Sequence, residues 1–177
     1  GADVQQVARG IGLDNRIGKK FLHAGPGFGG SCFPKDTRSA ASFAREAGEP
    51  LEIVEAVIRV NERQRERMIE KIDRILDGSA QGKTVAVLGL SFKPETDDMR
   101  DAPSLDIIRA LLARGASVRA FDPVAMPNAA RELPSITYCK NEYEACENAD
   151  ALVLVTEWNQ FRMLDLERVK SLLRSPV

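Results

Sequence analysis

The sequence is poor in histidine and cysteine and contains no long apolar run. The sequence contains one histidine, His23, and no pair of cysteines at metal-ligand spacing. A zinc site is therefore not predicted, because too few ligands are available. The three cysteines, Cys32, Cys139 and Cys146, share no repeated spacing, which argues against a disulfide framework and favours a reducing compartment. The longest apolar stretches, such as residues 151–155, are far shorter than a membrane span.

An excess of one charge is also lacking, because 25 Lys and Arg residues nearly balance 26 Asp and Glu residues. The net charge of −1 predicts no nucleic-acid surface, although a few local cations would suffice for a small anionic ligand. With 44% hydrophobic and 29% charged residues, the chain is predicted to fold as a globular protein. No signal peptide opens the sequence, so we expect a cytoplasmic protein, and both ends read as cut from a longer chain.

The first 80 residues are predicted to be mainly helical. Residues 1–22 read as helix with a turn near position 11, and residues 36–47 read as a second helix. Between them, residues 24–36 are too rich in glycine and proline for regular structure and must form a shaped loop. Apolar residues recur at helical spacing over residues 50–77, giving a helix of roughly 40 Å that suits a connector between domains and is compatible with dimer packing.

The pattern changes after a polar break at residues 78–82, which predicts a domain boundary that separates residues 1–80 from residues 81–177. Beyond it, short apolar segments alternate with amphipathic ones, which predicts an α/β domain with a Rossmann-like parallel sheet. The fold class is therefore α/β, with a helical segment and a long helix preceding the sheet. The expected strands are 83–89, 117–121, 136–139 and 151–155, and the expected helices are 103–114, 142–147 and 162–174.

Cys32 is the residue best placed for chemistry. It comes just before a predicted helix, whose free N–H groups favour a negative charge and therefore a thiolate. Lys35 would act in the same direction, and the neighbouring glycines let a bulky substrate approach the backbone. The structural alternative is a buried core cysteine, which we expect for Cys139 and Cys146.

Two neighbours of Cys32 remain open to more than one interpretation. Asp36, four residues on, is placed either to accept a proton from the thiol or simply to cap the helix. His23 would allow a cysteine hydrolase, in which an imidazole activates the thiol.

A second cluster follows the first predicted strand, at residues 89–100, where α/β folds bind ligands. The glycine pattern G-x-G-x-x-G is absent, so this domain is not a standard dinucleotide site. Lys93 and Arg100 suit phosphate oxygens, although a cation of this kind, taken alone, is more often a solvated surface charge. Asp122 could accept a ribose hydroxyl, whereas Trp158 is expected to pack in the core or at its edge.

Four segments together resemble the nucleotide-sugar dehydrogenases, the UDP-glucose/GDP-mannose dehydrogenase family. They occur in that family's order, and the likeness runs over essentially the whole chain. The run from Phe28 to Asp36 favours relatives that oxidise UDP-glucose over those that oxidise GDP-mannose or UDP-N-acetylmannosamine. The matching segments are 14–36, 89–104, 121–123 and 156–161.

The resemblance implies an NAD-dependent oxidation of UDP-glucose to UDP-glucuronate. In that reaction a sugar alcohol becomes an aldehyde, a thiolate adds to it, and a second hydride transfer gives a thioester that water hydrolyses. By resemblance Cys32 is the nucleophile, and Asp36 assists proton transfer at the thiol or the water. Lys93 is expected to bind substrate, while Lys35 and Arg100 are expected to approach NAD.

The resemblance also implies contacts to the sugar and to a second subunit. Arg16 matches an arginine that members lend to the neighbouring subunit's substrate, which implies a homodimer at least. The helix over residues 50–77 matches the family's long central helix, which joins the domains and packs at the dimer interface. The residues expected around the sugar and diphosphate are Phe21, Leu22, His23, Ala24, Gly25, Phe28 and Gly29.

The departures from the family are absences. The N-terminal dinucleotide-binding domain, a catalytic lysine and asparagine of the central domain, and a later arginine have no counterpart in these residues. We therefore expect the chain alone not to turn over. Two alternatives stay open, namely oxidation of a different nucleotide sugar and a module that only binds nucleotide sugar or dimerises.

Overall fold

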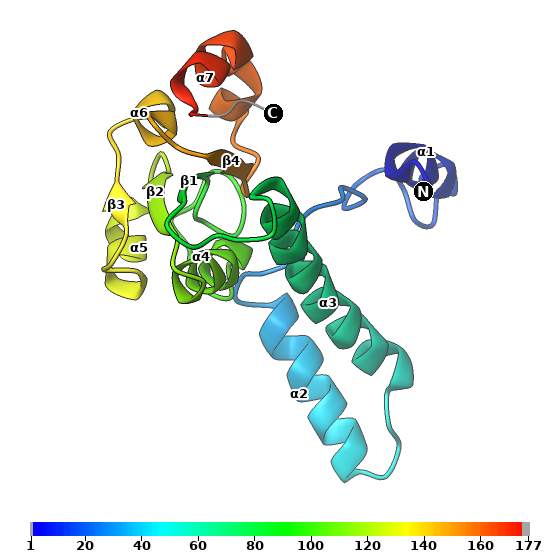
Figure 1. Cartoon of the computed structure of the whole chain (residues 1–177). Coiled ribbons are helices and arrows are strands. Elements are labelled where there is room, and N and C mark those ends of the chain that lie inside the picture. Colours follow the sequence, from blue (N-terminus) through cyan, green and yellow to red (C-terminus); the bar gives the residue numbers. More distant parts are fainter. Residues whose placement is uncertain (1, 175–177) are drawn as a thin grey trace.

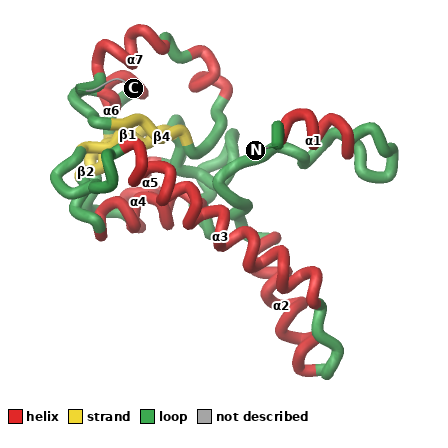
Figure 2. The backbone as a smooth tube through the Cα atoms, turned by 45° about the vertical axis from the view of Figure 1, so that its right-hand side comes forward, coloured by secondary structure: helices red, strands yellow, loops and turns green. Residues whose placement is uncertain are grey.

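The computed structural model describes residues 2–174 and places a helical region before an α/β domain. Helix α1 (Val4–Ile11) is capped by the Asp3 carboxylate, which accepts hydrogen bonds from the N–H groups of Gln5 and Gln6. It stands apart from the other elements (Figure 1). Helices α2 (Phe33–Glu46) and α3 (Glu52–Ile75) pack side by side as a hairpin that projects away from the sheet, as Figures 1 and 2 show.

The helical predictions need three corrections. Residues 12–22 contain no helix, because the backbone turns repeatedly there and takes positive φ values at Gly18 and Phe21. Helix α2 begins at Phe33, three residues earlier than predicted, so Cys32 lies directly at its N-terminus. Helix α3 begins after Pro50 and ends at Ile75, two residues short of the predicted end.

The sheet is fully parallel, as the sequence predicted. Its strands are β1 (Thr84–Leu88), β2 (Ser117–Phe121), β3 (Thr137–Tyr138) and β4 (Ala151–Leu154), arranged in the order β3-β2-β1-β4. Strand β1 pairs with β2 and β4, and Val85 lies opposite both Val118 and Ala151. Because β1 is covered on both faces, its apolar run is continuous rather than alternating. The α/β, Rossmann-like fold class is confirmed.

Two hydrophobic layers cover the sheet. Val85 and Val87 face helix α4 (Pro103–Ala113) and the end of α3, where Ile72 is buried. Ala86 and Leu88 face the opposite layer, which contains α6 (Glu142–Cys146), the 3-10 helix η1 (Asn159–Met163) and α7 (Leu166–Leu172). The sheet therefore has helices on both sides, and the end of α3 is part of its core.

One helix was missed and one was drawn too long. Helix α5 (Met126–Glu132) was missed, and it connects β2 to β3 because two parallel strands require a crossover. Ala129 and Leu133, which are four residues apart, are buried in the first layer. The helix predicted over residues 162–174 is instead η1 followed by α7, because Asp165 starts a new helix by capping the N–H of Arg168. No helix among residues 2–174 has both the length and the apolar character needed to cross a lipid bilayer.

Candidate active site around Cys32

Cys32 is solvent-exposed and occupies the N-cap position of α2. Its sulfur lies 3.7 Å from the Ser31 hydroxyl, and its carbonyl accepts a hydrogen bond from the N–H of Asp36 at 2.8 Å. The thiol thus stands at the end of the helix where the first backbone N–H groups have no partner within the helix. Cys139 and Cys146 are buried core residues, as predicted, and burial raises the pKa of both thiols, to about 11 for Cys146.

Lys35 and Asp36 form an exposed ion pair next to the thiol. The Lys35 ammonium donates to Asp36 Oδ1 at 2.5 Å, and this hydrogen bond is the main reason that the pKa of Lys35 is raised. A negative charge on Cys32 contributes in the same direction. The interpretation of Asp36 as the helix cap is wrong, because α2 starts at Phe33 and the cap is Cys32. Within residues 2–174, the Asp36 carboxylate makes no hydrogen bond to a backbone N–H group.

The thiol loop, which we define as residues 24–32, docks onto the segment that follows β1. The N–H of Gly30 donates to the carbonyl of Arg100 at 2.8 Å. The ring of Phe92 approaches the backbone of Gly30 so closely that a Cβ there would lie 2.7 Å from Cε2. Gly30 also has a φ of +88°, which favours glycine. Lys93 follows Phe92 and Cys32 follows Gly30 by two residues, so this contact brings the two predicted site segments together.

Arg100 is an exposed cation that pairs with a carboxylate of the same segment. Its guanidinium donates to both carboxylate oxygens of Asp98, with the Nη2–Oδ2 distance at 2.7 Å. This pairing holds the pKa of Asp98 below its ordinary value and raises that of Arg100, to which a charge on Cys32 adds. Lys93 is exposed, with its ammonium 5.4 Å from the centre of the Phe92 ring. Both cations are therefore available to an anionic ligand.

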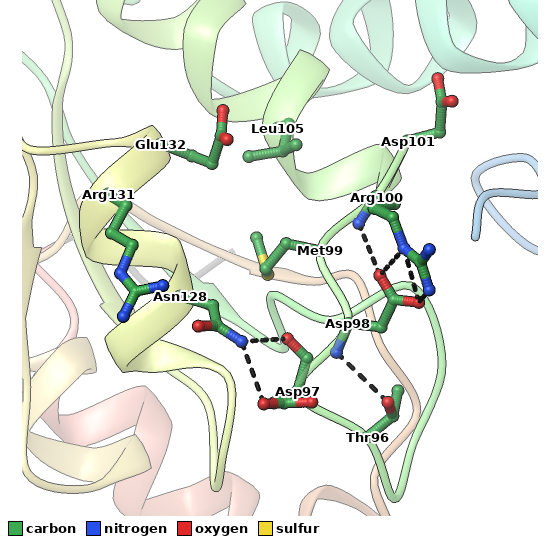
Figure 3. A pocket seen from close by; sticks show the side chains of 10 residues that line it. All are labelled: Thr96, Asp97, Asp98, Met99, Arg100, Asp101, Leu105, Asn128, Arg131 and Glu132. Carbon is green, nitrogen blue, oxygen red and sulfur yellow. Dashed lines mark hydrogen bonds and ion pairs between the residues drawn. The ribbon is translucent and has the colours of Figure 1, made fainter. Parts of the chain in front are cut away.

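A hollow of about 680 Å³ lies beyond Arg100, between the 96–101 segment and α5 (Figure 3). Asn128 reaches across it from α5 and donates to the Asp97 carboxylate at 3.0 Å. Arg131 also lines the hollow, whereas Cys32 does not. Arg100 thus lines this hollow and, through its carbonyl, also contacts the thiol loop.

Asp122 does not bind a ribose, contrary to one interpretation of the sequence. Its side chain is fully buried, and both carboxylate oxygens are occupied by donors of the protein itself. These donors are the N–H groups of Leu90, Ser91, Val124 and Ala125, the Ser91 hydroxyl and the Trp158 indole. Asp122 instead ties the ends of β1 and β2 together, and Trp158 packs in the core as expected.

The residues before the thiol loop are not gathered around Cys32. Arg16 is exposed and pairs with Asp14, and Phe21 is 90% exposed. Both belong to the stretch that follows the separate helix α1 (Figure 1). His23 is exposed and, within residues 2–174, makes no hydrogen bond to Cys32, so the cysteine-hydrolase hypothesis loses its base.

The remaining predicted ligand residues lie in or beside the thiol loop. Leu22 is half-buried and Ala24 is exposed, immediately before the glycines. Gly29 packs against the Asp101 carbonyl and the Pro103 ring, which leaves no room for a side chain. The Phe28 ring meets Phe33 edge-on, with ring centres 5.9 Å apart.

Sequence reasoning missed the polar side chains of α3 that hold this loop. Asn61, Gln64 and Arg65 hydrogen-bond to the backbone of Gly25 and Phe28. Their spacing of three and four residues puts them on one helix face, which is the signal that could have identified them. The sequence predicted only that the helix over residues 50–77 connects domains.

Comparison with known proteins places this geometry in a family. Residues 86–177 match the UDP binding domain of the UDP-glucose/GDP-mannose dehydrogenase family, and residues 1–63 match its central domain. The chain belongs to the UDP-glucose/GDP-mannose dehydrogenase family. The thiol loop therefore lies within the match to the central domain, and Lys93 and Arg100 lie within the match to the UDP binding domain.

Individual relatives agree with this assignment. The chain is 49% identical, over its whole length, to a UDP-glucose 6-dehydrogenase of Rhizobium meliloti and to UDP-glucose 6-dehydrogenase TuaD of Bacillus subtilis. A solved UDP-glucose dehydrogenase from Pyrobaculum islandicum superposes with a TM-score of 0.88 and 40% identity, covering 93% of this chain and 38% of that one. The chain spans 40% and 38% of the two curated relatives, respectively.

Proposed function

We propose that this chain supplies the catalytic thiol and the nucleotide-sugar site of an NAD-dependent UDP-glucose 6-dehydrogenase. The observation that carries the proposal is the contact between the exposed thiol loop and the segment after β1, which joins Cys32 to the part of the chain that matches a UDP binding domain. The 49% identity to UDP-glucose 6-dehydrogenases supports UDP-glucose as the substrate. We propose a cytoplasmic enzyme, because the unpaired cysteines suit a reducing compartment.

The proposed reaction uses the thiol to divide a four-electron oxidation into two hydride transfers. The C6 alcohol of UDP-glucose loses a proton and a hydride to become an aldehyde. The Cys32 thiolate then adds to the aldehyde carbon while the carbonyl oxygen takes up a proton, which gives a thiohemiacetal. The thiohemiacetal loses that proton and a second hydride to become a thioester. Water attacks the thioester carbon, which releases UDP-glucuronate and regenerates the thiol. Each hydride requires one NAD, so two are reduced for each product.

The neighbours of Cys32 can support these steps. The Asp36 carboxylate is exposed on the first turn of α2, and we propose that it receives a proton from the thiol or from the hydrolytic water. Lys93 offers its ammonium to the diphosphate as a point charge. The backbone of the thiol loop is uncrowded at Gly25, and we propose that the hexose approaches the loop there.

We propose that this chain supplies only a few of the contacts to NAD. Lys35 and Arg100 are exposed cations within electrostatic reach of Cys32, which suits contact with a dinucleotide pyrophosphate or ring. The connection after β1 runs from residue 89 to residue 102 without the glycine pattern that cradles a pyrophosphate. When bound, NAD supplies the hydride acceptor. We propose that its main cradle lies in a domain outside these residues, and that the chain alone does not turn over.

A homodimer forms part of the proposal. The projecting hairpin exposes large apolar side chains on α2 and α3, including Phe43, Ile53 and Val60, with Ile53 83% exposed. Apolar surface of this kind is usually covered by a partner. Arg16 is exposed and pairs only with the nearby Asp14 among the described residues, and we propose that it reaches the substrate of the neighbouring subunit.

The test is a Cys32→Ala substitution in the complete protein supplied with UDP-glucose and NAD. We expect loss of UDP-glucuronate formation, measured by chromatography, because no thioester can form without the sulfur. Undiminished acid formation would contradict the covalent role. Robust NADH production by the isolated chain would contradict the need for a second domain.

Substrate choice needs its own measurement. A panel of UDP-glucose, GDP-mannose and UDP-N-acetylmannosamine is offered to the complete protein, and kcat/KM is compared. We expect UDP-glucose to be preferred. A module that only binds nucleotide sugar would bind UDP-glucose in calorimetry while the complete protein reduces no NAD.

A further inference from the structure

The backbone of Phe28 in the thiol loop is held by one side chain of α3. Asn61 Nδ2 donates to the Phe28 carbonyl at 3.1 Å, and the Phe28 N–H donates to Asn61 Oδ1 at 2.8 Å. The amide of Asn61 thus satisfies both backbone groups of one residue, as a neighbouring β-strand would. Phe28 lies four residues before Cys32, so this pairing anchors the loop close to the thiol.

The loop comes close enough to α3 that only glycine fits between them. A Cβ on Gly27 would lie 2.9 Å from Asn61 Oδ1 and 3.4 Å from Arg65 Cγ, and the φ of Gly27 is +117°. Gln64 adds a third attachment by donating from Nε2 to the Gly25 carbonyl at 2.9 Å. The α3 face formed by Asn61, Gln64 and Arg65 therefore follows the loop along several residues.

Arg65 connects the same loop to the α/β domain. Its Nη2 donates to the carbonyl of Phe28 at 2.9 Å and to that of Asp101 at 2.8 Å, while Nη1 pairs with the Asp106 carboxylate. The Arg65 side chain is only 12% exposed. One guanidinium thus fixes three elements, namely α3, the thiol loop and the start of α4 with the segment before it.

Arg65 also has an unfavourable feature, which argues against a role in stability alone. The buried Nε of Arg65 has no hydrogen-bond partner within residues 2–174, and an unpaired buried donor opposes folding. The ion pair with Asp106 is itself weak evidence for stability, because the Asp106 side chain is 42% exposed and solvent screens the attraction. What the guanidinium provides is geometry, because two carbonyls from distant parts of the sequence meet at one planar, rigid group.

We propose that Asn61 and Arg65 are positioning residues that set the thiol loop, and with it Cys32, against the segment carrying Lys93 and Arg100. This rests on the proposed function for its catalytic consequence. A shift of about 1 Å between reacting groups can cost about a hundredfold in rate. Two side chains of α3 thus control how the sulfur meets the sugar.

The structural half of the proposal is tested on this chain by amide hydrogen exchange. In Arg65→Met and Asn61→Leu, we expect the Phe28 and Gly30 amides to exchange at least about tenfold faster than in the unaltered chain. The amides of Val85 to Leu88 in β1 report global unfolding and should not change. Arg67→Met is the matched control, because Arg67 is exposed on the same helix. Unchanged exchange at Phe28 and Gly30 would overturn the proposal.

The catalytic half is tested in the complete protein by separating kcat from KM. Arg65→Met should lower kcat for UDP-glucose about tenfold to a hundredfold while KM stays within about twofold, because the loop and not the nucleotide contact is displaced. Arg65→Lys, which keeps the charge but loses the fork, should recover part of kcat. A role in stability alone would lower the amount of folded protein and leave kcat per alkylatable Cys32 unchanged, which would overturn the proposal.

The experiments distinguish a failure of the proposed function from a failure of the positioning role. If the unaltered complete protein does not oxidise UDP-glucose, the proposed function is wrong and the catalytic half of this inference falls with it. The exchange measurement still decides whether Asn61 and Arg65 hold the loop. If the unaltered protein is active and Arg65→Met keeps full kcat, only the positioning role is wrong.

Discussion

The ring of Phe92 packs directly against the backbone of Gly30, and this contact joins the thiol loop to the α/β domain. The Gly30 N–H reinforces it by donating to the Arg100 carbonyl. Residues about sixty positions apart in the sequence are thus in contact, and Cys32, Lys93 and Arg100, which lie close to this contact in the sequence, are exposed. The chemistry proposed for this protein depends on that docking.

Gly30→Ala tests the docking through stability. The added methyl group would lie 2.7 Å from Phe92 and would require a strained positive φ, so we expect a loss of about 2 kcal/mol or more in the free energy of unfolding. The measurement is urea denaturation. Gly25→Ala is the control, because no atom lies within 4 Å of its Cβ position, and it should change stability little. When Phe92→Leu is combined with Gly30→Ala, the protein should recover the part of the lost unfolding free energy that is due to the clash with the ring.

Thiol labelling tests the different surroundings of the three cysteines. In the native protein Ellman's reagent should modify Cys32 rapidly, because it is exposed, and leave the buried Cys139 and Cys146 unmodified. All three thiols should react after denaturation. Cys32→Ala should abolish the native reaction. Native labelling of three thiols in the unaltered chain would contradict the burial described here.

Asp122→Asn tests whether this carboxylate organises the ends of β1 and β2. The amide nitrogen would face backbone N–H donors now bound to Oδ1 or Oδ2, so we expect a loss of about 3 kcal/mol in unfolding free energy. Asp165→Asn is the control, because asparagine caps a helix as well as aspartate does. Equal stability of the two variants in urea denaturation would refute the role assigned to Asp122.

Alkaline pH should weaken the fold through the buried thiols. Burial raises the pKa of Cys146 from 9.0 to about 11 and also raises that of Cys139. A raised pKa stabilises the fold below the unfolded value, and this contribution is lost as pH rises towards the folded value. For Cys146 the loss between pH 9 and about 11 is of the order of 2 to 3 kcal/mol.

Urea denaturation from pH 8 to 11 measures this decline. The Cys139→Ala/Cys146→Ala double variant should show a flatter profile than the unaltered chain. Tyr138, whose pKa burial raises from 10.0 to about 12, adds a decline that begins only above about pH 10. A profile that stays flat from pH 8 to 10 in the unaltered chain would contradict the prediction.

Local sequence patterns predicted most of the sheet domain. The apolar run at β1 and the helix opened by Pro103 were predicted within one residue of their observed bounds. Both signals are local, since burial on two faces gives an unbroken apolar strand and a proline suits a first helical turn. Helix α5 was missed, although the need to cross over between two parallel strands implied it.

The sequence by itself determined which residues carry the chemistry that we propose, because a cysteine among glycines beside a helix start is a local arrangement. Only the tertiary structure decided what surrounds it. The capture of Phe28 by Asn61, the bridge of Arg65 to Asp101 and the burial of Asp122 join residues that are tens of positions apart. Side-chain hydrogen bonds of this kind depend on how the helices and the sheet pack, so no periodicity within one segment reveals them.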